Sequence, residues 1–196
     1  MTIQPALALL EFDSIAAGIV AGDAMVKRAS LDLLKAGTVQ PGKYLVLIGG
    51  SVADVEEAID AAQVAESGSL VDIVFLPDVH PDVVAAVAGT RRTDDGEALG
   101  VIETTTVAAI IQAADAGVKG ARVTLRELRM ADGLGGKGYL LFGGAVADVE
   151  AAIDVGSGRA GGQLVRHTVI SQLHGEMLDN LSADGRFERL VRTEEE

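Results

Sequence analysis

Apolar runs and stretches of helical periodicity alternate along the chain, and their order predicts the secondary structure. Ala6–Phe12 is a continuous apolar run typical of a buried strand, and Ile15–Arg28 carries apolar residues at helical spacing. The other elements predicted in the first half are strands at Leu31–Val39, Lys43–Ile48 and Leu70–Leu76, a helix from Ser51 to Glu66, and a turn with a short helix within Pro77–Ala88. This order is that of a ferredoxin-like domain, a sheet with its helices on one face.

The second half of the chain repeats this pattern. The segment PGKYLVLIGGSVADVEEA at 41–58 returns as GGKGYLLFGGAVADVEAA at 135–152. The elements predicted there are strands at 98–104, 121–131, 138–142 and 163–170, and helices at 105–119, 145–158 and 173–181. A repeat of this length is typical of tandem domains. We therefore predict an α+β fold of two tandem ferredoxin-like domains, at residues 1–91 and 92–182, joined through the turn-rich segment 89–97 and followed by a charged C-terminal tail at 183–196.

The composition argues against several classes of binding partner and of metal site. The net charge of −13 disfavours nucleic acids and anionic membrane surfaces, and aromatic residues, at only 3%, are too few for base-stacking platforms. Cysteine is absent, which excludes disulfides and cysteine-ligated metal sites. No apolar stretch reaches membrane-spanning length, and the first residues do not resemble a signal peptide. We therefore expect a soluble, cytoplasmic protein that binds neither nucleic acid nor membrane.

No group of residues in the sequence predicts catalysis. The glycine pairs that precede the second helix of each half lack the Lys-Ser/Thr of a P-loop. Three histidines are present without ligand-like spacing, and His80 and His174 correspond in the repeat, so we expect them to share a structural role. Glu11 and Glu103 end a strand beside the first helix of each half, where capping or hydrogen bonding is favoured over acid–base chemistry. We predict no enzymatic activity, no metal and no cofactor.

Two turns occupy corresponding positions in the halves. They are Gln40-Pro41-Gly42 and Leu134-Gly135-Gly136, and each lies directly before a lysine, Lys43 or Lys137. Taken alone, each could be an ordinary hairpin turn, or its glycine backbone could form a concavity that accepts anions.

A second repeated feature is the lysine near the end of the first helix, Lys27 in one half and Lys119 in the other. A cation there complements the helix dipole. A lysine at a repeated subunit edge is the alternative, and the spacing alone does not choose between them.

The two strand–helix openings, LALLEFDSIAAGIVAGDAMVKRAS and LGVIETTTVAAIIQAADAGVKGARV, resemble the opening of the shell proteins of bacterial microcompartments. The glycine-bearing turn ten residues before the strand-end glycine resembles the pore loop of that family. The resemblance covers roughly residues 6–88 and 98–181. Two copies in one chain, each beginning with the family's first strand, resemble its tandem-domain class in the unpermuted form.

This resemblance implies a structural shell tile, because tandem members of the family form trimers that mimic hexamers. It implies a homotrimer whose central pore passes small metabolites, in the shell of a cytoplasmic microcompartment. The implied partners are the hexamer and pentamer tiles of the shell, with encapsulated enzymes as further candidates. The residues that correspond to the family's pore loop are Gln40, Pro41, Gly42, Leu134, Gly135 and Gly136, and those that correspond to its tile-edge lysine are Lys27 and Lys119.

The chain departs from the family pattern near the end of each domain, in its lack of cysteine, and in the pore turn, which lacks the family's common Gly-Ser-Gly in both repeats. The usual Pro-Arg-Pro-His is Pro77-Asp78-Val79-His80 in the first half and Ser171-Gln172-Leu173-His174 in the second, so the arginine that supports tile-edge contacts is missing. The cysteine-held iron–sulfur cluster of some tandem members is excluded. The alternative function is a regulatory protein, since tandem ferredoxin-like domains also bind small molecules at their interfaces.

Overall fold

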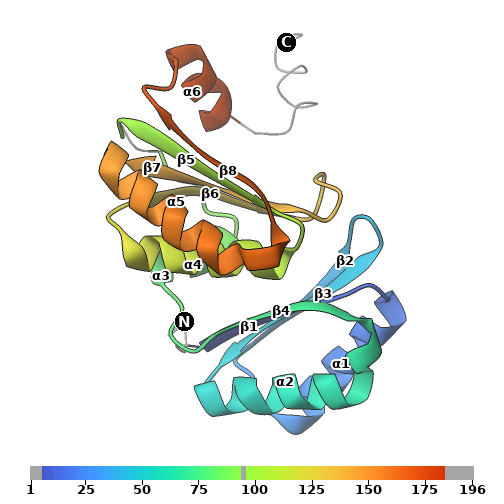
Figure 1. Cartoon of the computed structure of the whole chain (residues 1–196). Helices are drawn as coiled ribbons and strands as arrows, with labels where there is room; N and C mark the ends of the chain where they lie inside the picture. Colours follow the sequence, from blue (N-terminus) through green and yellow to red (C-terminus); the bar gives the residue numbers. More distant parts are fainter. Residues whose placement is uncertain (1–5, 94–95, 184–196) are drawn as a thin grey trace.

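The computed structural model describes residues 6–93 and 96–183. The first half consists of β1 (Ala6–Phe12), α1 (Ile15–Arg28), β2 (Leu33–Val39), β3 (Lys43–Gly50), α2 (Val52–Glu66), β4 (Leu70–Leu76) and α3 (Pro81–Val87). The second half consists of β5 (Ala98–Thr104), α4 (Val107–Gly120), β6 (Thr124–Met130), β7 (Gly138–Gly144), α5 (Val146–Ala160), β8 (Leu164–Ser171) and α6 (Gly175–Ser182) (Figure 1). The predicted order of elements is confirmed in both halves. The predicted tail lies outside the described residues from position 184 onward.

Each half forms a four-stranded antiparallel sheet, with strand order β2-β3-β1-β4 in the first and β6-β7-β5-β8 in the second. Helices α1 and α2 cover one face of the first sheet, and α4 and α5 cover one face of the second (Figure 1). This is the strand order expected for a split βαβ unit. The predicted fold class, two tandem α+β domains, is confirmed.

The strand registers show where the two copies differ in length. Leu9 lies opposite Leu47 in the first sheet, and Val101 lies opposite Leu141 in the second. The offset between the copies is therefore 92 residues in the first strand and 94 in the third. The two additional residues of the second copy lie in the turn between β6 and β7, at one of the candidate sites.

Local chemistry explains where the helices begin. The hydroxyl of Ser14 accepts a hydrogen bond from the N–H of Ala17 at the start of α1, and Thr106 does the same for Ala109 at the start of α4. Within α4, Gly117 lies against the ring of Phe142 so closely that a β-carbon would clash with the ring. The glycine therefore lets the helix sit directly on the sheet.

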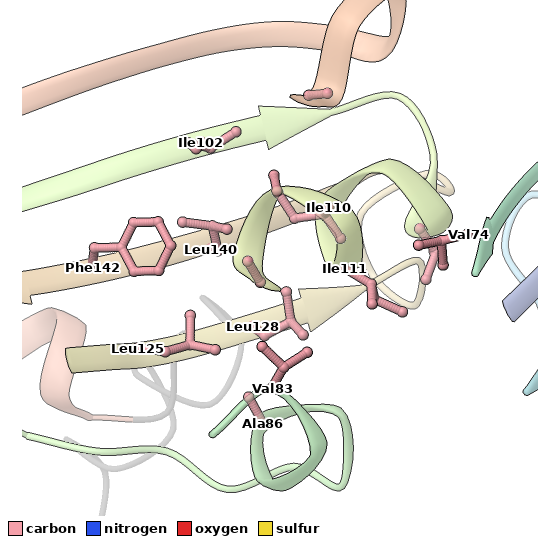
Figure 2. Close-up of a cluster of buried hydrophobic side chains, with 14 of the residues drawn as sticks. Val74, Val83, Ala86, Ile102, Ile110, Ile111, Leu125, Leu128, Leu140 and Phe142 are labelled. Carbon is pink, nitrogen blue, oxygen red and sulfur yellow. The ribbon is translucent and has the colours of Figure 1, made fainter. Parts of the chain in front are cut away.

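The apolar core of the second half extends into the first half. Val83 and Ala86 of α3 face Leu125 and Leu128 of β6, as Figure 2 shows, and all four belong to one buried cluster. A separate cluster fills the space between the first sheet and its helices α1 and α2. Helix α3 thus follows the first repeat in sequence but packs on the second. The domain limits at 91 and 92 stay a prediction drawn from the repeat.

Candidate functional site

The two predicted pore turns lie side by side, although they are far apart in the sequence. The backbone N–H of Gln40 donates to Oδ1 of Asp132 at 3.3 Å, and the N–H of Gly133 donates to Oε1 of Gln40 at 3.2 Å. The β2–β3 and β6–β7 hairpins converge at this point (Figure 1). The fold therefore brings the candidate residues of both halves to one place on the molecule.

The longer turn uses most of its amides internally. The N–H groups of Leu134 and Gly136 both donate to the carbonyl of Ala131, and the N–H of Lys137 donates to the carbonyl of Leu134. Gly135 and Gly136 have φ angles of 63° and 85°, a left-handed conformation that glycine adopts without steric cost. These bonds are those of a tight hairpin turn. They leave few backbone N–H groups free to bind an anion, so the structure favours an ordinary hairpin turn over an anion-accepting concavity.

The lysine after each turn is paired with the strand-end glutamate of its own half. Lys43 Nζ lies 2.5 Å from Oε1 of Glu11, and Lys137 Nζ lies 2.7 Å from Oε1 of Glu103. The other oxygen of Glu11 accepts the N–H of Val107 at 2.8 Å, at the first residue of α4. The expected capping role is confirmed for Glu11, with the difference that it caps a helix of the opposite half.

The two candidate tile-edge lysines lie in different surroundings. Lys119 pairs with Asp115 at 2.7 Å and donates to the backbone carbonyl of Asp78, so it belongs to the contact between the halves. Lys27 pairs with Asp23 at 2.5 Å, and 73% of its side chain is exposed. Both lysines lie in the last turn of a helix, where a cation complements the helix dipole.

The corresponding histidines share the expected structural role. His80 Nδ1 accepts the N–H of Asp82 at the start of α3, and His174 Nδ1 accepts the N–H of Glu176 at the start of α6. Within 6–93 and 96–183, no three His, Asp or Glu side chains are grouped so that they could hold a metal ion. The same ranges contain no helix long and apolar enough to cross a bilayer.

Tyr139 lies next to the longer turn, on β7. Burial raises the pKa of its phenol above the ordinary value of 10.0, and the nearby carboxylate of Glu127 raises it further. Arg129 opposes this shift, with its guanidinium 5.7 Å from the centre of the ring. The phenol is therefore neutral at physiological pH.

A family model described as the BMC domain matches the chain twice, at residues 6–79 and 98–173. The two matches coincide with the two sheets and together cover more than half of the chain. The chain belongs to the BMC domain family. The bacterial microcompartment shell protein PduT of Citrobacter freundii is 44% identical to it over 177 residues, which are 89% of this chain and 96% of PduT. The shell protein EutM of Salmonella typhimurium is 42% identical over 83 residues, which are 41% of this chain and 84% of EutM.

Solved structures of BMC proteins agree with this assignment. A microcompartment protein from Desulfitobacterium hafniense DCB has a TM-score of 0.77 and 41% sequence identity, over 89% of this chain and 98% of that one. A fused permuted hexameric shell protein from the RMM microcompartment has a TM-score of 0.58 at 22% identity, over 79% of this chain and 83% of that one, and shows likeness of fold alone. The resemblance to tandem-domain shell proteins is confirmed, and with it the role of a structural shell protein.

Sequence reasoning missed the residues that join the halves of this BMC protein. Asp132 holds the backbone of Gln40, and Asp115 accepts the backbone N–H of His80 at 2.8 Å. The available signal was that Asp115 and His80 both have counterparts in the other repeat, Asp23 and His174. Periodicity could not show that the two residues meet, because they belong to different halves.

Proposed function

We propose that three copies of this chain form a ring of six domains around a central pore, and that this ring is a tile of a microcompartment shell. The observation that supports it most directly is the pair of hairpin tips held together by Gln40 and Asp132. If each chain contributes two adjacent tips, three chains contribute six. The tile would act as a wall and a passage, and not as a catalyst.

The exposed apolar side chains support a ring of this kind. Ile111 on α4 is fully buried between the halves, whereas its repeat counterpart Ile19 on α1 is 54% exposed. In the same way, Val83 on α3 is fully buried, whereas its counterpart Met177 on α6 is 52% exposed. The helix faces that are buried between the halves on α4 and α3 are therefore exposed in their repeat counterparts, on α1 and α6. Surfaces that match head to tail form closed rings when the rotation between units closes.

In this arrangement the pore is lined by three copies of each turn in alternation. Gln40-Pro41-Gly42 is the shorter turn, and Leu134-Gly135-Gly136 lies in the longer one. The lysines beside the turns are neutralised by Glu11 and Glu103, so they add little net charge at the rim. We propose that the pore passes small polar metabolites.

We propose that Lys27 and Lys119 lie at the outer edge of the tile, where it meets other shell proteins. Hexamer and pentamer tiles are the proposed neighbours, and encapsulated enzymes are further candidate partners. Lys27 supports this most clearly, because its exposed ammonium has one described partner, Asp23 on the preceding turn. Lys119 retains 40% exposure of its side chain while it binds Asp115.

The mass of the protein in solution tests the ring directly. Analytical ultracentrifugation and mass photometry are expected to give three times the chain mass of 20.1 kDa. Electron microscopy is expected to show a six-lobed disc with an axial hole. A stable monomer at micromolar concentration would contradict the proposal. A monomer whose melting temperature rises with an added metabolite would favour the regulatory alternative.

A further inference from the structure

The contact between the halves contains a complete helix cap supplied from across the interface. Glu11 is fully buried, its Oε1 bound to Lys43 at 2.5 Å and its Oε2 accepting the N–H of Val107 at 2.8 Å. Val107 is the first residue of α4, and its N–H has no acceptor within the helix. The carboxylate therefore satisfies an orphan donor and complements the positive end of the helix dipole.

The repeat counterpart of this cap is present in two separated parts. Glu103 corresponds to Glu11, and Oε1 of Glu103 is bound to Lys137 at 2.7 Å in the same way. Ile15 corresponds to Val107 and is the first residue of α1. In the part of the chain that the structure describes, no backbone N–H donates to Glu103, and no group accepts the N–H of Ile15. The Glu103 side chain is 36% exposed.

We propose that Glu103 of one copy caps α1 of the next copy, with its Oε2 accepting the N–H of Ile15 across the interface. This inference rests on the proposed ring, since the two parts belong to different chains. The occupant of the exposed α1 terminus is a second copy of this chain, because the internal cap already shows the carboxylate, its lysine and the receiving helix fitting together. The exposed apolar face of α1 that carries Ile19 continues the same surface.

A second polar contact between the halves also has a repeat counterpart whose two residues belong to different contact surfaces of the single chain. Asp115 accepts the backbone N–H of His80 at 2.8 Å within the chain, and only 7% of the Asp115 side chain is exposed. Its counterpart Asp23 is 57% exposed on α1, and the counterpart of His80 is His174, at the start of α6. The same geometry would let Asp23 of one copy accept the N–H of His174 of another. In this contact α1 supplies the acceptor, and in the Glu103 contact it supplies the donor, so the two contacts fix both the position and the direction of the neighbouring chain.

The test is subunit exchange between labelled and unlabelled trimers, with amide hydrogen exchange measured at the start of α1. Glu103→Ala removes the acceptor and is expected to raise the trimer dissociation constant and the subunit exchange rate by about tenfold or more, the typical effect of losing a charged hydrogen bond. Glu103→Gln keeps an acceptor oxygen and is expected to fall between Glu103→Ala and the wild type. The N–H groups at the start of α1 should exchange faster in Glu103→Ala trimers.

Lys137→Met is the matched control, because it breaks the pair within the chain and leaves the carboxylate in place. It should keep slow hydrogen exchange at the start of α1. The proposed cap is wrong if Glu103→Ala exchanges subunits and amide hydrogens at wild-type rates, or if Glu103→Ala and Lys137→Met have equal effects. Either result would leave the proposed ring untouched. A wild-type chain that is monomeric would instead overturn the ring on which the cap rests.

Discussion

Asp115 of the second half accepts the backbone N–H of His80 of the first half, with 2.8 Å between nitrogen and oxygen. The same carboxylate binds Lys119, whose ammonium also donates to the carbonyl of Asp78. One nearly buried acid thus fixes the turn from which α3 departs onto the second half. Val83, three residues after His80, is fully buried in the core of the second half.

Replacing Asp115 with alanine is therefore expected to destabilise the chain by about 2–4 kcal/mol, because two hydrogen-bonding partners lose a buried acceptor. Urea denaturation followed by circular dichroism measures this change. Asp60→Ala, an exposed aspartate on α2, serves as the control and is expected to change stability by less than about 0.5 kcal/mol. Equal effects of the two substitutions would show that the contact with His80 is not important for stability.

Gly117→Ala is expected to destabilise the protein by about 1–3 kcal/mol, since the new methyl group overlaps the ring of Phe142 and α4 must move off the sheet. Gly158→Ala makes the same chemical change in α5, at a position with no neighbouring atom within 4 Å. It should stabilise the helix by up to about 1 kcal/mol. Thermal unfolding measures the stability of both variants. A destabilised Gly158→Ala would show that the loss in Gly117→Ala does not arise from the clash with Phe142.

Ile19→Glu and Met177→Glu are expected to prevent ring formation while each chain stays folded. Both side chains are exposed in the single chain, so their replacement costs little there, but a carboxylate in an apolar interface remains without a partner. Size-exclusion chromatography with light scattering measures the result. Val64→Glu changes a residue that is 89% exposed on α2 and should leave the assembly intact. Trimers formed by all three variants would contradict the proposed interface.

Lys27→Asp is expected to impair assembly of tiles into sheets, because its ammonium is exposed at the end of α1, and to weaken the trimer only as far as it disturbs Asp23 at the proposed chain–chain contact. Lys119→Asp should impair sheets as well, and it should also lower the stability of the chain by placing a second carboxylate beside Asp115. Electron microscopy of assembled material, together with trimer mass, separates the two effects. Normal sheets in both variants would exclude the edge role.

The raised pKa of Tyr139 gives a prediction for alkaline solution. A raised folded-state pKa means that the stability contributed by the neutral phenol is complete below the unfolded value, near pH 10, and is lost as the pH rises through the folded value. Stability should therefore fall above pH 10, and Tyr139→Phe should reduce this fall. Absorbance titration of the wild type minus Tyr139→Phe isolates the phenol, and a midpoint at or below 10.0 would refute the shift.

The order of elements and the repeat could be predicted from the sequence because both are encoded locally. Strand and helix periodicity depend on neighbours within a few residues, so Ala6–Phe12 and Ile15–Arg28 were placed without any knowledge of the fold. The shared structural role expected of His80 and His174 is a helix cap, formed with the residue two positions further along the chain in each case. The family resemblance followed from the same local segments.

What only the tertiary structure decided is how the two halves meet. The sequence predicts a capping or hydrogen-bonding role for Glu11, but the helix that it caps lies in the other half, at Val107. Helix α3 follows the first sheet in sequence and yet completes the core of the second through Val83. Such contacts join residues many positions apart, and their energy depends on geometry that no local pattern contains. The sequence by itself therefore determined two similar modules, and the packing of one upon the other determined which surfaces remained for a neighbouring chain.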